Sequence, residues 1–298
     1  MNSVHYTSCP VCDSKEINPL LTVPDHSVSK ESFVVWQCSQ CTLRFTQDAP
    51  DEAHIEKYYR SEDYISHTNT DKGIINKLYQ RARTFTLEQK KNLIKKTTGL
   101  ERGALLDVGA GTGAFVASMK ESGWEATGIE PDADARNLAK KTFNADLLDI
   151  SQLQHLSPAS FNAITLWHVL EHVHQLHYYI ERLKDLLHQN GKLFIAVPNY
   201  TSGDASIYNL WWAAYDVPRH LYHFNPRSME VLMNRHGLKI NEQRPMWLDA
   251  FYISLLSSKY RNKKPKLLAA GFNGLRSNIK AAFNKERCSS IIYIIEKA

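Results

Sequence analysis

Residues 104–113 read ALLDVGAGTG, an apolar run with one aspartate that ends in a loop containing three glycines. The run predicts a buried β-strand, and the glycines predict tight turns that let a ligand approach the backbone closely. The following residues predict a helix with Phe115, Val116 and Met119 facing inward and Gly123 at its end. Strand, glycine loop and helix in this order are typical of a cofactor cradle, although the loop alone fits a nicotinamide enzyme nearly as well.

Alternating strands and helices continue beyond this cradle. Because this alternation is typical of doubly wound sheets, residues 101–298 are predicted to form an α/β domain. Strands are expected at 104–108, 125–130, 145–148, 162–167, 192–197, 238–243 and 290–295. Helices are expected at 133–143, from about Val173 to Gly191, and from Pro226, capped by Asn225, to Gly237. Residues 199–224 are rich in aromatics without a clean period and are predicted to be an inserted lid.

Two acidic residues stand at the ends of predicted strands. Asp107 precedes the first glycine by two positions, and Glu130 follows Gly113 by 17. A carboxylate at Asp107 suits a cationic amino-acid group better than a pyrophosphate. A carboxylate at Glu130 can accept hydrogen bonds from both hydroxyls of a ribose. The structural alternatives are a helix-capping acid for Asp107 and an exposed strand-end acid for Glu130.

Four of the five cysteines form two pairs with the same spacing, Cys9 with Cys12 and Cys38 with Cys41, and 25 residues lie between the pairs. Two residues between thiolates let both sulfurs point inward from one turn, as tetrahedral Zn²⁺ requires. With short strands expected at 20–23 and 32–36, residues 1–48 are predicted to form a zinc-ribbon-like module with structural zinc. Two disulfides or one redox pair are the alternatives, and disulfides fit a cytoplasmic chain poorly. His26 is an additional candidate ligand, and Cys288 is expected to be an ordinary thiol.

The composition, with 43% hydrophobic and 22% charged residues in 298, excludes a mainly disordered chain. No apolar run approaches the roughly 18–20 residues of a membrane span, and no signal-peptide pattern is present, so we expect a cytoplasmic protein without a membrane partner.

Residues 49–100 predict a helical linker, where Tyr64 is a candidate wall of a ligand pocket. Residues 257–288 form a basic insertion, with nine Lys or Arg against one acid in a chain of net charge +5. That patch either meets an anionic partner or is a solvated surface.

Three motifs resemble those of class I S-adenosylmethionine-dependent methyltransferases. They are DVGAGTG at 107–113, GIEP at 128–131 and LWHVLEHV at 166–173, and they occur in order. The resemblance implies a doubly wound, mostly parallel seven-stranded sheet with a reversed hairpin at its edge, and S-adenosylmethionine as cofactor. It also implies a set of cofactor-binding residues: Asp107, Gly109 and Gly111 at the methionine part, with Gly113 completing the loop, Glu130 at the ribose, Asp149 near the adenine, and Trp167 and His168 beside the sulfonium.

The four cysteines ahead of this domain resemble the front end of sugar C-methyltransferases that act on nucleotide-linked keto-deoxysugars. In that family a His-Glu-His-Leu segment after the fifth strand carries the catalytic base. The matching segment here is VPRHLYHF at 217–224, which puts His220 at the base position. Arg219 replaces the preceding glutamate, and the family's third, C-terminal domain has no counterpart. The ubiquinone-pathway O-methyltransferases resemble the central domain about as well but lack the ribbon.

Methyl transfer to oxygen or carbon requires alignment of the reactants and removal of a proton from the acceptor, so a base with a pKa near neutrality helps. His220 is the first candidate, His172 the second and His223 the third, and Glu171 is a candidate for holding one of them. Each is alternatively a hydrogen-bonded packing residue, because the chain has 13 histidines. The lid aromatics either wall the acceptor pocket or pack on the sheet. They are Trp211, Trp212 and Tyr215.

We therefore predict a methyltransferase that acts on a small polar acceptor, such as a sugar or a biosynthetic intermediate, by O-methylation with a histidine base. The alternative is an RNA-modifying methyltransferase that grips nucleic acid with the ribbon and the basic insertion. A third hypothesis, a non-catalytic interaction protein, is disfavoured by the intact Asp107, Gly109, Gly111 and Glu130. The sequence specifies neither the acceptor nor the oligomeric state.

Overall fold

The computed structural model describes residues 2–59 and 74–298, with the side chains of 74–83 left out. The chain forms two compact units. Unit 1 comprises Met1–Ile65, Leu170–Leu176 and Ala196–Ile294, and unit 2 comprises Ser66–Val169, His177–Ile195 and Ile295–Ala298. Tyr64 therefore lies outside the described residues.

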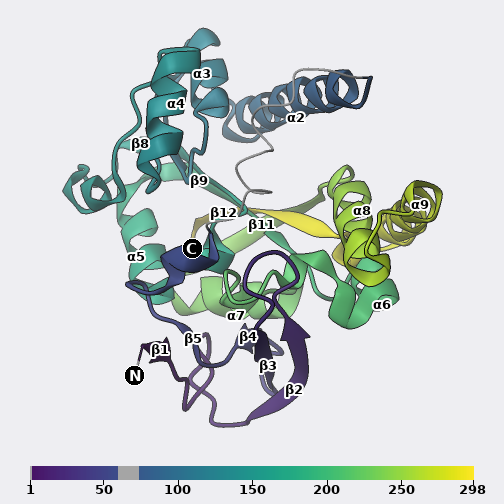
Figure 1. Cartoon of the computed structure of the whole chain (residues 1–298). Coiled ribbons are helices and arrows are strands. Elements are labelled where there is room, and N and C mark those ends of the chain that lie inside the picture. Colours follow the sequence, from purple (N-terminus) through teal and green to yellow (C-terminus); the bar gives the residue numbers. More distant parts are fainter. Residues whose placement is uncertain (1, 60–73) are drawn as a thin grey trace. The chain divides into compact units, whose positions relative to one another are not determined.

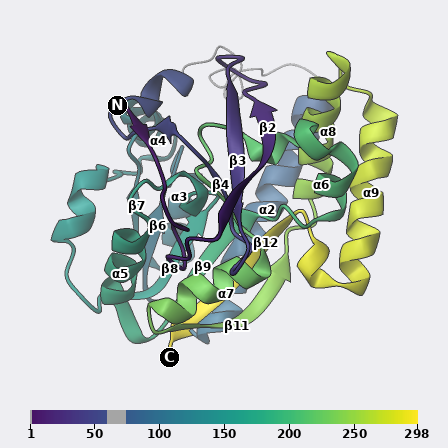
Figure 2. The same ribbon diagram turned by 90° about the horizontal axis from the view of Figure 1, so that it is seen from below.

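A six-stranded sheet has the order β11-β12-β9-β8-β6-β7, and β6 pairs in parallel with both β7 and β8. Figure 1 labels β8, β9, β11 and β12 of this sheet, and Figure 2 labels all six strands. The strands are β6 (Ala104–Val108), β7 (Glu125–Ile129), β8 (Phe161–Trp167), β9 (Leu187–Pro198), β11 (Leu238–Pro245) and β12 (Ser290–Lys297). This sheet, with helices between its strands, confirms the predicted α/β fold class.

The predicted strand at 145–148 is reduced to one parallel bridge between Ile129 and Leu148. Leu148 donates its N–H to Gly128 and accepts from the N–H of Glu130. The segment is too short for a strand because Asn144, with φ 50°, ends one helix and Asp149 caps the next. The sheet thus has six strands and a bridge among the described residues, where seven strands were expected.

Unit 2 contains the helix that precedes β6 and the helices that follow β6 and β7. They are α2 (Ile74–Thr98), α3 (Ala114–Glu121), α4 (Ala133–Phe143) and η2 (Ile150–His155), and α4 has the predicted bounds. The helix expected to reach Gly191 is α5 (Leu176–Leu186), which ends earlier, and β9 begins at the next residue. Ala159 and Ser160 donate their N–H groups to the carbonyls of Asp185 and Leu186, so tertiary contacts satisfy the end of α5.

The N-terminal part of unit 1 is a small four-stranded sheet with the order β10-β4-β3-β2, beside the pair β1–β5. Its elements are β1 (Ser3–Val4), β2 (Ile17–Pro24), β3 (Ser32–Cys38), β4 (Arg44–Thr46), β5 (Ala49–Pro50), η1 (Ile55–Tyr58) and β10 (Tyr222–His223). Because β10 comes from the predicted lid, the cysteine-rich segment and the lid share one sheet. Val23 and Val35 also share a buried core with Tyr208, Trp212 and Tyr215.

The remaining helices of unit 1 flank this core. They are η3 (Leu170–His172), α6 (Gly203–Tyr208), η4 (Asn209–Trp211), η5 (Ala213–Tyr215), α7 (Pro226–Arg235), α8 (Asp249–Asn262), α9 (Leu267–Phe283) and η6 (Lys285–Arg287). Asn225 forms a capping box with Ser228 at the start of α7, which confirms the predicted helix start. The basic insertion falls on the end of α8, on α9 and on η6, and α6, α8 and α9 pack together (Figure 2).

No helix in the described part of the chain is both long enough and apolar enough to cross a bilayer.

Candidate active site and cysteine cluster

The glycine loop joins β6 to α3, and its three glycines all have positive φ. A Cβ on Gly109 would lie 2.4 Å from Cγ2 of Val169, and one on Gly113 would lie 2.9 Å from Cβ of Ala139. At Gly111 a Cβ would meet nothing within 4 Å, and the N–H of Gly111 donates to Oε2 of Glu130 at 2.7 Å. The loop is therefore closely packed at its two ends and open in the middle, where a ligand can approach the backbone.

Asp107 is buried at the carboxyl end of β6, where its Oδ1 accepts a hydrogen bond from the hydroxyl of Thr165 at 2.6 Å. Burial raises the pKa of Asp107 to about 7, and the neighbouring Glu130 carboxylate adds to this, while Thr165 and Lys90 act in the opposite direction. A cation that binds beside such a carboxyl favours its ionised form. The capping alternative does not apply, because the N-cap of α3 is Gly113.

Glu130 follows β7, and its carboxylate is engaged by two backbone N–H groups. Oε2 accepts from Gly111 at 2.7 Å, and Oε1 accepts from Asp132 at 3.0 Å. Glu130 is only 9% exposed, so it is not the exposed strand-end acid of the structural alternative. Burial raises its pKa despite these donors. Each oxygen still has lone-pair capacity for a further donor.

Asp149 is the N-cap of η2, where it accepts from the N–H and the hydroxyl of Ser151 at 3.0 and 2.8 Å. These donors, with an ion pair to Arg136 at 3.1 Å, lower the pKa of Asp149. Asp149 follows directly on Leu148, the residue that bridges to the end of β7. Glu130 and Asp149 are therefore the residues that directly follow the two bridged residues, Ile129 and Leu148.

Trp167 and His168 lie at the carboxyl end of β8. Phe115 meets the Trp167 ring edge-on at 5.8 Å between centroids. Lys90 Nζ lies 4.2 Å from the Trp167 centroid, within cation–π range. Lys90 is not among the predicted site residues, because its segment, 49–100, is predicted to be a helical linker. A lysine with buried Leu93 and Ile94 on the same helix was the available signal for a helix that packs on the sheet.

The two cysteine pairs meet in unit 1. The Sγ atoms of Cys9 and Cys41 lie 3.4 Å apart, those of Cys12 and Cys38 lie 3.6 Å apart, and all four lie within 4.8 Å of one another. No disulfide joins them. Tetrahedral coordination with Zn–S bonds of about 2.3 Å separates sulfurs by roughly 3.8 Å. The cluster therefore has the dimensions and the donor set of a four-thiolate zinc site.

Both pairs form the same backbone turn. Asp13 donates its N–H to the carbonyl of Cys9, and Thr42 donates to that of Cys38. Asp13 and Thr42 also share a left-handed conformation, with φ 58° and 62°. The added candidate ligand His26 lies elsewhere, stacked between Trp211 and Tyr260 at 4.8 and 4.9 Å. The cluster is thus made by cysteines alone among the described residues.

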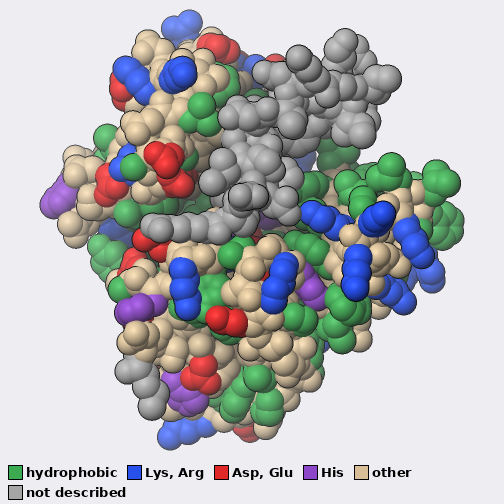
Figure 3. Space-filling view, in the orientation of Figure 1, with side chains coloured by type: hydrophobic (Ala, Val, Ile, Leu, Met, Phe, Trp, Pro, Cys, Tyr) green, Lys and Arg blue, Asp and Glu red, His purple; other side chains and the backbone are tan. Residues whose placement is uncertain are grey.

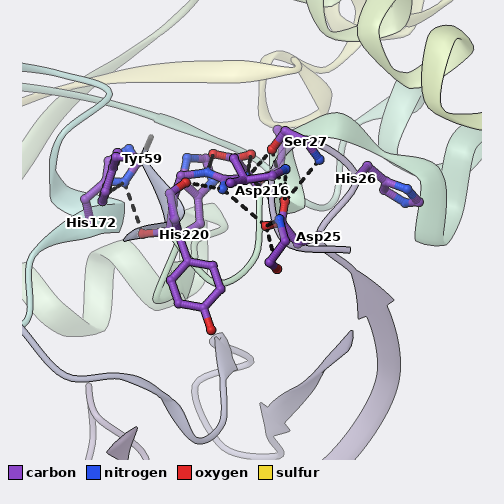
Figure 4. Close-up of polar contacts among 12 residues, drawn as sticks. Asp25, His26, Ser27, Tyr59, His172, Asp216 and His220 are labelled. Atoms are coloured by element: carbon purple, nitrogen blue, oxygen red, sulfur yellow. Dashed lines mark hydrogen bonds and ion pairs between the residues drawn. The ribbon is translucent and has the colours of Figure 1, made fainter. Parts of the chain in front are cut away.

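The first two histidine candidates face each other in unit 1 (Figure 4). The rings of His172 and His220 are 4.6 Å apart and nearly perpendicular. Nδ1 of His220 lies 2.9 Å from the carbonyl of Ala214, and Nδ1 of His172 lies 3.1 Å from that of Arg219. Because a carbonyl only accepts, each Nδ1 donates, and each neutral ring keeps its lone pair on Nε2. Glu171 lies beside them, within 4.8 Å by its nearest oxygen.

Burial determines the protonation of His172. Burial lowers the pKa of His172 to about 4, and the neighbouring His220 adds to this effect. The hydroxyl of Tyr59 also lies 3.0 Å from Nδ1 of His172. His172 is therefore neutral at physiological pH and too weak a base to hold a proton there.

Arg219 lies at the centre of a buried ionic network, and Figure 4 labels two of its partners, Asp25 and Asp216, near His220. Its guanidinium contacts Asp25 at 3.0 Å and Asp216 at 2.7 Å, and it donates to the carbonyl of Tyr58 at 2.7 Å. Although burial opposes ionisation, the hydrogen bond from Arg219 and the N–H groups of the turn hold the pKa of Asp25 well below its usual range. Arg219 thereby ties the turn between β2 and β3 to the segment that carries His220.

The third candidate, His223, lies in β10 with 3% exposure, where Nε2 contacts the Thr46 hydroxyl at 3.2 Å. Burial lowers its pKa well below the usual value. Two lid aromatics are also packing residues: Trp212 donates to Asp204 at 2.8 Å, and Tyr215 accepts from Arg44 at 2.7 Å. The structure thus brings His172 and His220 together and places His223, Trp212 and Tyr215 in the core.

Comparison with known proteins gives consistent matches. A family model described as "Methyltransferase domain" matches residues 77–243. The chain is 36% identical over 118 residues to a ubiquinone biosynthesis O-methyltransferase of Glaesserella parasuis serovar 5, covering 36% of this chain and 50% of that protein. It is 28% identical over 110 residues to a protein of the same name from Idiomarina loihiensis, covering 35% and 45%. The chain thus spans about half the length of the curated relatives it matches.

One solved structure aligns over most of the chain. It is magnesium protoporphyrin IX methyltransferase from Synechocystis PCC 6803 with bound SAH. The TM-score is 0.54 with 11% identity, and the alignment covers 83% of this chain and 100% of that chain. At this identity the likeness shows a shared fold.

Proposed function

This chain belongs to the methyltransferase domain family as a class I S-adenosylmethionine-dependent enzyme, and on that premise we propose that it methylates a hydroxyl group of a small polar acceptor. The names of the curated relatives support oxygen as the methylated atom. The tautomer of His220 carries the proposal. Its Nδ1 donates to the Ala214 carbonyl, so Nε2 is the basic nitrogen.

The residues of unit 2 fit S-adenosylmethionine. Asp107 offers a buried carboxyl for its ammonium group, and Gly111 offers open backbone. Glu130 has acceptor capacity for two ribose hydroxyls beyond its bonds to Gly111 and Asp132. Trp167 has a buried indole N–H without a partner among the described residues. When bound, the cofactor supplies an electrophilic methyl group on a sulfonium.

His220 is the proposed base. When the acceptor oxygen takes the methyl group that the cofactor would supply, Nε2 of His220 would accept the hydroxyl proton of the acceptor. The products are the methylated acceptor, S-adenosylhomocysteine and a protonated His220. The Ala214 carbonyl accepts from Nδ1–H in both states, so the ring keeps its orientation while its charge changes.

His172 is proposed to position the acceptor and not to remove its proton. Its pKa of about 4 makes it a poor base, yet its neutral Nε2 can accept a hydrogen bond.

The test measures S-adenosylhomocysteine formation with a panel of phenols, sugars and nucleotide-linked keto-sugars, and locates the new methyl group by mass spectrometry. We expect methylation on oxygen. His220→Asn is expected to lower kcat by roughly 10²- to 10⁴-fold without changing S-adenosylhomocysteine binding. Methylation on carbon, or an unchanged kcat in the variant, would contradict the proposal.

We also propose that Cys9, Cys12, Cys38 and Cys41 hold a structural Zn²⁺. The matching turns and the sulfur separations support this, and four thiolates leave no open position for catalysis. The proposed metal stabilises the β2–β4 sheet, and through Asp25 and Arg219 it supports the segment that carries His220.

A further inference from the structure

The large apolar side chains of helix α9 lie on its solvent-exposed face, whereas a helix in a globular core buries such side chains. Its large apolar residues point to solvent: Leu268 is 92% exposed, Phe272 66% and Phe283 90%. Leu275 and Ile279 complete the row, at spacings of four, three, four and four residues. This spacing places all five on one side of the helix, and we call them the α9 stripe.

The opposite side of α9 is made of small residues. Ala270, Gly274, Ser277 and Ala281 are buried where α9 packs on α8 and α6. A Cβ on Gly274 would lie 2.8 Å from the Phe251 ring, so the two helices approach closely. The backbones pack tightly only with these small residues inside, which leaves the large residues outside.

Polar contacts prevent α9 from rotating to bury its stripe. Ser277 donates to the fully buried Asp204 at 2.7 Å, and Asn273 donates to the Tyr208 hydroxyl at 3.0 Å. Asn278 donates to the Trp247 carbonyl at 2.8 Å. Turning the helix would break these bonds and would take the Ser277 donor from the buried carboxylate of Asp204, which is unfavourable although Trp212 and Ser289 also donate to it. The exposure of the stripe is therefore a property of the packing.

Basic residues lie beside the stripe and at the ends of α9, and Figure 3 shows Lys and Arg side chains over the part of the face that α8 and α9 form. Arg276 and Lys280 are exposed on α9 itself, and further Lys and Arg lie at its two ends. Those at the ends are Lys263, Lys264, Lys266, Lys285 and Arg287, all exposed. An apolar stripe with flanking cations is the pattern of a helix that lies in the interface of an anionic membrane.

We infer that α9 docks this protein onto the surface of an anionic phospholipid bilayer, with the stripe in the acyl region and the basic residues at the phosphates. Charge complementarity distinguishes this occupant from a second copy of the chain, because self-association would bring two basic segments together. Three of the five stripe residues, Leu268, Leu275 and Ile279, are aliphatic and offer no stacking surface for RNA, so only Phe272 and Phe283 could stack on bases.

Flotation of the full chain with vesicles tests the inference. Vesicles of equal parts phosphatidylglycerol and phosphatidylcholine are expected to carry the protein, and pure phosphatidylcholine vesicles to carry at least about tenfold less. The triple variant Leu268→Ser, Phe272→Ser, Phe283→Ser is expected to lose at least about tenfold in partitioning. Neutralising Lys264 and Lys266 to Gln is expected to cost about fivefold per charge, and less at high salt.

The matched control is Phe85→Ser with Leu20→Ser, which removes exposed apolar residues elsewhere and should leave partitioning unchanged. Leu268→Asn alone, at the most exposed position, serves if the triple variant does not fold. Equal binding to both vesicle types, or unchanged partitioning of the α9 variants, would overturn the inference. So would a dimer that the triple variant dissociates, or RNA binding without vesicle binding. S-adenosylhomocysteine binding measured alongside separates these outcomes from a failure of the methyltransferase site.

Discussion

The carbonyl oxygen of Ala214 determines which nitrogen of His220 is basic, and the carbonyl of Arg219 does the same for His172. Neither assignment is visible in the sequence, where both residues are simply histidines. Their environments also separate them, since burial lowers the pKa of His172 to about 4. This low pKa is the reason why His172 is proposed to position the acceptor and not to take its proton.

Asp107→Asn is predicted to weaken S-adenosylhomocysteine binding at about pH 8 by roughly 10- to 100-fold, because the ammonium group of the ligand loses its buried counter-charge. In the wild type, affinity is expected to rise as the pH passes upward through about 7, the pKa to which burial raises Asp107. The variant should lack this rise. Calorimetric titration over a pH series is the measurement, with His155→Asn as a surface control.

The same substitution is predicted to stabilise the unliganded protein at high pH. A raised acid pKa means that the stability contributed by the protonated carboxyl is present at low pH and is lost as the pH rises from about 4 to 7. Asn stays neutral, so its free energy of unfolding should exceed that of the wild type by roughly 2–4 kcal/mol above pH 7 and match it below about pH 4. A variant that is less stable at high pH in urea unfolding would argue against this pKa.

At the level of elements, two turns with the same hydrogen bond bring the four cysteine sulfurs together, and one arginine joins that region to the lid. The two turns are local, so the cysteine spacing sufficed to predict them. The arginine contact is long-range, because Asp25 and Arg219 are 194 residues apart in the chain. In the sequence, Arg219 is only a departure from the glutamate of the resembled family. In the structure, it forms buried ion pairs with Asp25 and Asp216.

Cys38→Ser is predicted to abolish stoichiometric zinc binding and to lower the melting temperature by about 10 °C, because a structural zinc site contributes directly to folding. Cys288→Ser is the matched control, since Cys288 is buried away from the cluster and contacts Met246. Zinc content by atomic absorption and thermal melting are the measurements. Equal zinc content in both variants would exclude the four-cysteine site.

Asp25→Asn is predicted to destabilise the protein by about 3 kcal/mol at neutral pH, because it leaves Arg219 with a weakened buried partner. Since the pKa of Asp25 is depressed, its contribution is present above about pH 4 and is lost as the pH falls below that value. The difference between variant and wild type should therefore vanish in acid. Urea unfolding at a series of pH values measures it, and Asp146→Asn, at an exposed ion pair, provides the control.

For the whole molecule, the two compact units do not coincide with the predicted segments 1–48, 49–100 and 101–298. Residues 1–59 belong with 196–294 in unit 1, and Val23 and Val35 share a core with Trp212 and Tyr215. The glycine loop lies in unit 2 together with α2, which carries Lys90. Cutting the chain after residue 48 would therefore separate Val23 and Val35 from the core that they share with Trp212 and Tyr215.

A fragment containing residues 49–298 is accordingly predicted to lose the cooperative unfolding of unit 1, because removal of β2–β4 uncovers Trp212 and Tyr215. It should bind a dye specific for exposed apolar surface and should lose methyl-transfer activity. Co-expression with residues 1–48 as a separate chain is expected to restore part of its solubility. A soluble, active 49–298 fragment would instead establish the N-terminal module as an independent appendage.

The sequence by itself determined the features that depend on neighbouring residues. The strand and glycine loop at 104–113, the Asn225 cap and the paired cysteine turns follow from φ preferences and hydrogen bonds within a few residues. Only the tertiary structure decided where α5 ends, that residues 145–148 form a bridge, and that the α9 stripe faces outward. Those outcomes depend on contacts between distant segments, and apolar periodicity shows that a helix has two faces without showing which of them is buried.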